Sequence, residues 1–131
     1  MSCAGDYRHG AGEDFNRGIE EFNVGNWFDC HEIMEELWVG APDGLRDLYQ
    51  GILQVAVALH HWQKGNFKGA MLLFASGTKL LRHLERCCLG VDVAGFNAAA
   101  ERMAGALESL GAARMHDLDR QLIPRIRRVD E

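Results

Sequence analysis

Polar side chains that could do chemistry lie within a strongly apolar part of this sequence. His31 and Glu35 stand four positions apart, so an imidazole and a carboxylate can meet on one side of a helix. A second polar stripe, with steps of three, four or seven residues, follows in the next apolar segment. It consists of Arg46, Gln50, Gln54 and His61. Because polar groups are costly in apolar surroundings unless they are paired, we expect a polar site here.

Three interpretations of this site remain open. If the two segments pack as antiparallel helices, the polar residues could form a structural hydrogen-bond network that sets the helix register. They could instead bind a small molecule or a protein partner, as exposed tryptophans would favour. This predicted binding set is His31, Glu35, Trp38, Arg46, Gln50, Gln54 and His61. On this interpretation the protein is a non-enzymatic interaction or ligand-binding module without a cofactor.

The third interpretation is catalysis. The run His31-Glu32-x-x-Glu35 is similar to the His-Glu-x-x-His spacing of zinc hydrolases, but a glutamate replaces the second histidine. His31, Glu35 and His61 could together hold a divalent metal such as zinc. Without a metal, His31 paired with Glu35 could act as a general base near neutral pH. We expect His60 to point away from this site, because neighbouring residues on a helix point about 100° apart.

The hydrophobic periodicity is helical almost throughout, which predicts an all-α fold. No alternating strand pattern flanks a hairpin turn. We expect a flexible N-terminal arm over residues 1–11, a helical domain over 12–111 and a C-terminal extension over 112–131. The extension should contain a short helical turn around residues 117–123 and an extended tail after Pro124. The predicted helices cover residues 12–24, 27–39, 44–64, 67–88 and 92–110, of which the third should be central and buried.

A weak internal repeat organises the first four helices. Gly25-Asn26-Trp27 and Gly65-Asn66-Phe67 each join two predicted helices, and the small residues Cys30 and Ala70 follow at matching positions. This pattern resembles a tetratricopeptide hairpin, although two copies are fewer than a solenoid needs. We therefore predict a compact bundle of about five helices that contains two tetratricopeptide-like hairpins.

Charge and composition exclude some classes of function. The net charge of −5 argues against a nucleic-acid binder, and no segment is apolar enough to span a membrane. The Arg-rich end (Arg120, Arg125, Arg127 and Arg128) is expected to be a solvated tail or the surface at a helix end. Without a signal peptide, the chain should be cytoplasmic with reduced thiols. Apolar surface that includes Leu72, away from the main face of its helix, suggests a homodimer.

Three motifs in residues 22–70 resemble a known family. They read Phe-Asn-x-Gly-x-aromatic-Phe-x-x-His-Glu-x-x-Glu-x-x-Trp, Arg-x-x-x-Gln-Gly-x-x-Gln and His-His-x-x-x-Gly-Asn-x-x-Gly-Ala. Together they are similar to the helical family known as domain of unknown function 309. The resemblance implies a small all-α fold and no established activity. It also implies shared positions, which are His31, Glu32, Glu35, Trp38, Arg46, Gln50, Gly51, Gln54, His61, Gly65, Asn66 and Gly69.

Overall fold

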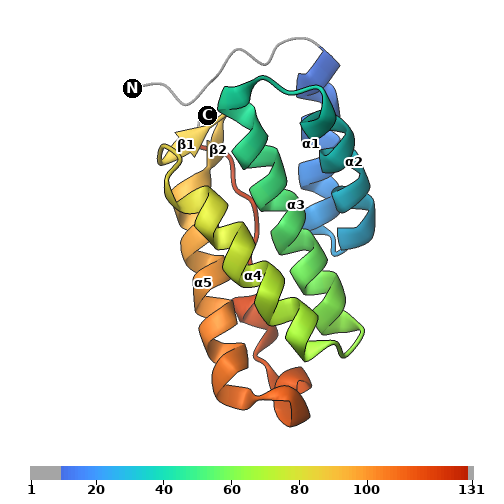
Figure 1. Cartoon of the computed structure of the whole chain (residues 1–131), viewed down its shortest axis with the longest axis vertical. Helices are drawn as coiled ribbons and strands as arrows, with labels where there is room; N and C mark the ends of the chain where they lie inside the picture. The colour runs from blue at the N-terminus through green and yellow to red at the C-terminus, as the bar shows by residue number, and fades with distance from the viewer. Residues whose placement is uncertain (1–9, 130–131) are drawn as a thin grey trace.

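A computed structural model describes residues 10–129, and nearly all of the regular structure in them is helical (Figure 1). The helices are α1 (Gly10–Asn23), α2 (Trp27–Val39), α3 (Asp43–Gln63), α4 (Phe67–Arg82) and α5 (Val93–Leu110), followed by the 3-10 helices η1 (Ala112–Asp117) and η2 (Arg120–Leu122). The predicted all-α bundle is thus confirmed, whereas the likeness to tetratricopeptide hairpins stays a prediction. The expected N-terminal arm lies mostly outside the described residues. No helix of the described chain is long and apolar enough to cross a membrane.

Short connections join each of the first four helices to the next. Gly25 and Gly65 adopt positive φ angles of 92° and 84°, a left-handed conformation that glycine tolerates best. The Asn66 side chain then caps α4 by accepting a hydrogen bond from the amide of Gly69 at 2.9 Å. The two Gly-Asn repeats of the sequence are therefore the two tight turns α1–α2 and α3–α4.

Helix α3 lies at the centre of the bundle between α2 and α4, as the sequence predicted (Figure 1). Its contact with α4 is close because glycines face each other there. A Cβ atom at Gly51 would lie only 2.6 Å from the side chain of Leu81, and one at Gly77 would lie 3.2 Å from the carbonyl oxygen of Gly51. This close approach fixes the position of α3 against α4.

Helix α4 ends earlier than predicted and is followed by a hairpin that we did not expect. Strand β1 (Cys87–Cys88) pairs antiparallel with β2 (Val91–Asp92). Leu89 and Gly90 between them have φ angles of 52° and 76°, as tight hairpins require at both central residues. Leucine rarely adopts this conformation, so Leu89-Gly90 is not a typical hairpin sequence, but burial of the Leu89 side chain offsets the strain. Cys87 is disulfide-bonded, so the expectation of reduced thiols is wrong for this residue.

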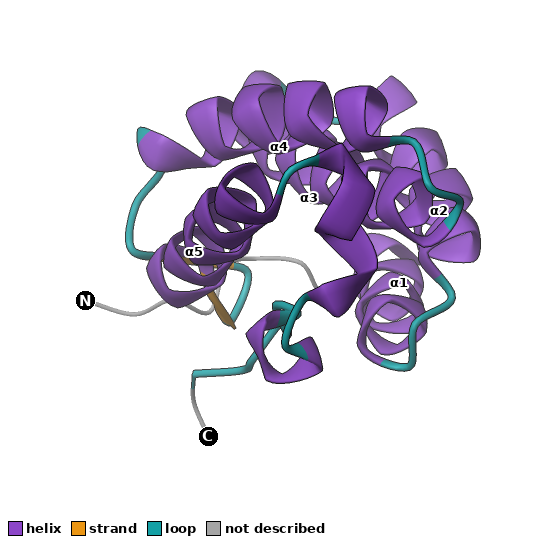
Figure 2. Ribbon diagram, turned by 90° about the horizontal axis from the view of Figure 1, so that it is seen from below, coloured by secondary structure: helices purple, strands orange, loops and turns teal. Residues whose placement is uncertain are grey.

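The C-terminal segment (residues 112–129) packs against the helices and lies between α5 and α1 (Figure 2). The indole Nε1 of Trp62 donates a hydrogen bond to the carbonyl oxygen of Met115 at 2.8 Å. Further along, the Asn23 side chain donates to the carbonyl oxygen of Ile126 at 2.9 Å and accepts from its amide at 2.8 Å. Met115 and Ile126 are buried. The predicted helical turn is present as η2. The segment packs on the domain through its apolar residues, while the four arginines of the Arg-rich end are exposed.

Candidate functional site

The first predicted contact of the site is present on α2. Nε2 of His31 lies 3.5 Å from Oε1 of Glu35, one helical turn further on, and more than half of the Glu35 side chain is exposed. The other ring nitrogen of His31, Nδ1, is buried and has no hydrogen-bond partner in the described part of the chain. Buried polar atoms usually have a partner. His31 is therefore not held by a complete hydrogen-bond network.

Arg46 contacts Trp38 where α2 connects to α3. The guanidinium carbon lies 4.4 Å from the centre of the Trp38 ring, within the range of a cation–π interaction. One guanidinium nitrogen also donates a hydrogen bond of 3.4 Å to the Trp38 carbonyl oxygen. Arg46 and Trp38, both predicted as site residues, thus contact each other across the loop that joins α2 to α3.

The remaining predicted residues of α3 do not hydrogen-bond to His31 or Glu35, so the network that we expected is not present in the described residues. Gln54 accepts a hydrogen bond of 2.5 Å from the hydroxyl of Ser76 on α4. Nδ1 of His61 lies 3.2 Å from the side-chain nitrogen Nδ2 of Asn66, which precedes α4. Gln50 makes no side-chain hydrogen bond to any described residue. The members of the polar stripe of α3 therefore face different neighbours, and Gln54 and His61 face α4.

His60, which we expected to point away from the site, instead lies beside α2. The centre of the Phe28 ring is 5.4 Å from that of His31 and 5.6 Å from that of His60. The His60 ring is in turn 6.4 Å from the ring of His61. The four side chains form a continuous line, which we call the aromatic row (His31, Phe28, His60 and His61). The row connects α2 with α3, and the Phe28 side chain is 51% exposed.

Burial and neighbouring charges lower the pKa of His60. Its partial removal from water has the largest effect, followed by the positive charges of Lys64, His61 and His31. A lowered pKa keeps the imidazole neutral at neutral pH. The centre of the aromatic row, formed by Phe28 and His60, is therefore uncharged under those conditions.

The geometry does not assemble the alternative metal site. In the part of the chain that the structure describes, no group of three or more His, Cys, Asp or Glu side chains is placed to hold a metal ion. His31 and Glu35 meet, but His61 is hydrogen-bonded to Asn66 at the other end of the aromatic row. The three residues proposed from the sequence thus do not converge on one point.

Comparison with known proteins agrees with the family resemblance. The family model described as "Domain of unknown function (DUF309)" matches residues 15–73. The chain is thus similar to this family over that segment. The matched segment contains most of α1, all of α2 and α3 and the start of α4, and therefore the whole aromatic row. The family description assigns no activity.

Two relatives are similar over part of their length. The "Uncharacterized protein YpuF" of Bacillus subtilis (strain 168) is 40% identical over 77 residues, which cover 56% of this chain and 44% of YpuF. An "Uncharacterized protein" of Aquifex aeolicus (strain VF5) is 35% identical over 46 residues, which cover 34% of this chain and 14% of that protein. The chain thus spans less than half the length of the curated relatives it matches.

Sequence reasoning found the two ends of the aromatic row but missed Phe28 and His60. A usable signal was present for Phe28, which precedes His31 by three positions and so lies on the same side of α2. No local signal identified His60, because the angle at which α2 crosses α3 decides which of two adjacent histidines faces Phe28. That angle depends on tertiary packing.

Proposed function

We propose that the protein is a non-catalytic interaction module and that the aromatic row is the centre of its binding surface. The partner is a segment of another protein chain that places an apolar or aromatic side chain on Phe28. The observation that carries this proposal is the position of Phe28, exposed and flanked by two imidazole rings from two different helices. Aromatic side chains often supply most of the binding energy at protein interfaces.

The hydrogen bonding around the row supports binding over a structural role. A buried polar network that fixes helix packing is expected to satisfy all of its members. His31 does not fit this description, because Nδ1 has no partner among the described residues and Nε2 lies beside an exposed carboxylate. The helices are instead held together by apolar packing and by the close approach of Gly51 to α4.

Electrostatics also favour an uncharged partner surface at the centre of the row. His60 is neutral at neutral pH because burial and nearby cations lower its pKa. Glu35 provides a negative charge at one end, where a donor group of the partner could bind. An apolar or aromatic side chain flanked by a hydrogen-bond donor would match this arrangement. A cytoplasmic location and a homodimer remain predictions.

Site-specific photocrosslinking tests the proposal. A photoreactive phenylalanine analogue would replace Phe28 in the full chain, expressed in the cells from which the protein comes. The matched control carries the same analogue at Leu72, which lies on α4 and has 62% of its side chain exposed. We expect a discrete crosslinked product from position 28 that differs from any product formed at position 72, which belongs to the predicted dimer surface.

Two further readouts sharpen this experiment. Adding His60→Ala to the position-28 protein should reduce the yield of the product, because the flanking ring is lost. A product that consists of two copies of this chain would support the proposal and identify the partner as the chain itself. Failure to crosslink at position 28, or the same products from positions 28 and 72, would contradict it.

A further inference from the structure

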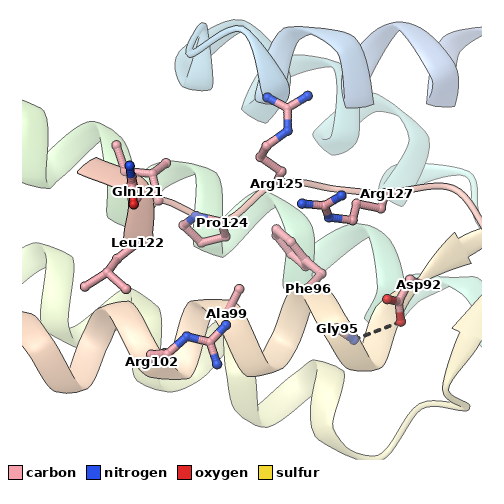
Figure 3. A pocket seen from close by; sticks show the side chains of 11 residues that line it. Asp92, Gly95, Phe96, Ala99, Arg102, Gln121, Leu122, Pro124, Arg125 and Arg127 are labelled. Atoms are coloured by element: carbon pink, nitrogen blue, oxygen red, sulfur yellow. Dashed lines mark hydrogen bonds between the residues drawn. The ribbon is translucent and has the colours of Figure 1, made fainter. Parts of the chain in front are cut away.

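A separate cavity of about 220 Å³ lies between α5 and the C-terminal segment (Figure 3). Phe96 of α5 and Pro124 of the C-terminal segment are both buried and form its apolar part. Arg102 of α5 and Arg127 of the C-terminal segment lie on opposite sides of these two residues (Figure 3). The cavity lies outside residues 15–73, so it is independent of the aromatic row.

The cavity concentrates positive charge in an acidic protein. Arg102, Arg125 and Arg127 all line it, although the whole chain has a net charge of −5. Arg125 extends toward α1 and donates a hydrogen bond of 3.3 Å to the carbonyl oxygen of Asn23. The side chains of Arg102 and Arg127 form no hydrogen bond or ion pair with any described residue. Two guanidinium groups are therefore free to bind an anion.

The one carboxylate that lines the cavity already has a role in the fold. Oδ1 of Asp92 accepts a hydrogen bond of 2.9 Å from the amide of Gly95 and so caps the start of α5. Within the described part of the chain, the Asp92 carboxylate forms no ion pair with the arginines of the cavity. The lining consequently keeps an excess of positive charge.

We propose that this cavity binds a small phosphate monoester. Guanidinium groups match the oxygens of phosphate with paired hydrogen bonds, and a phosphate monoester carries nearly two negative charges at neutral pH. Phe96 and Pro124 would contact the carbon part of the ligand. The side-chain amide of Gln121 would offer a further hydrogen bond. A volume of about 220 Å³ is below the range of sites for drug-sized ligands, so the ligand is no larger than a simple sugar phosphate.

Binding would connect two parts of the chain that are distant in sequence. Arg102 belongs to α5, whereas Gln121 and Arg127 belong to the C-terminal segment. A ligand that contacts both holds this segment on α5, and a ligand that binds only the folded state raises the unfolding temperature. The ligand therefore acts on the stability of the C-terminal segment as well as filling the cavity.

Calorimetric titration of the full chain at constant ionic strength tests this inference. The probes are glycerol 3-phosphate and ribose 5-phosphate, with glycerol, ribose and citrate as controls. We expect saturable binding of at least one phosphate ester, accompanied by a rise in unfolding temperature. The uncharged controls should not bind, and citrate should bind more weakly than the phosphate esters.

Matched variants distinguish a specific site from general attraction by positive charge. Arg102→Gln and Arg127→Gln should each weaken binding at least tenfold, and both side chains are exposed, so the fold should be retained. Arg114→Gln removes the same charge from an exposed residue outside the cavity lining and should leave the affinity unchanged. Equal weakening by all three variants, tighter binding of citrate, or no saturable binding of either ester would overturn the proposal.

Discussion

The ring centres of Phe28 and His60 lie 5.6 Å apart, and this contact joins α2 to α3 beside an exposed surface. The two residues come from different helical hairpins, so the contact depends on how the hairpins pack. Through this contact, His31 and His61, which the sequence predicted as site residues, lie at the two ends of the aromatic row. Because the pKa of His60 is lowered in this position, the stability of the fold should depend on pH.

His60→Gln should make the fold less sensitive to acid. The pKa of His60 is lowered in the folded protein from the ordinary value of 6.5, so the unfolded chain binds a proton more readily. The free energy of unfolding should then fall as the pH drops below about 6.5 and through the lower folded pKa. The variant lacks this titration. Denaturant unfolding between about pH 7 and pH 5 measures the difference, and identical pH profiles of the two proteins would refute the assignment.

Gln54 and Gln50 should differ in their effect on stability, although both were predicted as site residues. Gln54→Ala removes the hydrogen bond with Ser76 on α4 and should cost about 1 kcal/mol. Gln50→Ala removes no side-chain hydrogen bond to a described residue and should change stability by less than about 0.5 kcal/mol. Urea denaturation of both variants is the measurement. Equal losses of stability in the two variants would mean that the hydrogen bond between Gln54 and Ser76 does not stabilise the fold.

Gly51→Ala should destabilise the bundle. The added Cβ would lie 2.6 Å from two side-chain atoms of Leu81, so α3 and α4 would have to move apart, at a cost of about 1–3 kcal/mol. Gly105→Ala is the control, because its Cβ would meet nothing within 4 Å and alanine favours the helix by up to about 1 kcal/mol. Thermal unfolding should show opposite shifts. A neutral Gly51→Ala variant would contradict the close approach of the two helices.

Much of the fold was predictable because it follows from local rules. The helix boundaries near Gly25 and Gly65 agree with the sequence because only a few residues adopt the left-handed turn found there. The full burial of Cys30 and Ala70 follows from their matching positions after those turns. Burial also raises the pKa of the Cys30 thiol to about 12, as expected of a small core residue.

The features that were missed depend on contacts between distant parts of the chain. The turn at Leu89 is stabilised by burial of an apolar side chain, which no turn propensity encodes. Arg120, expected in a solvated tail or at a helix end, lies 5.2 Å from the ring of Trp62. The expected network failed for a similar reason, because helical spacing gives the side of a helix but not which neighbour covers it. Gln54 and His61 consequently face α4.

The most direct test of the account is the free energy of unfolding of the double variant Phe28→Ala/His31→Ala. If the aromatic row serves binding, its loss should cost the fold no more than about 1 kcal/mol, because Phe28 is half exposed and His31 Nδ1 has no partner among the described residues. The variant should keep its helical circular dichroism. It should no longer bind the partner that crosslinking at position 28 identifies. A loss of about 3 kcal/mol or more would contradict the account, since it would show that these side chains hold the helices together.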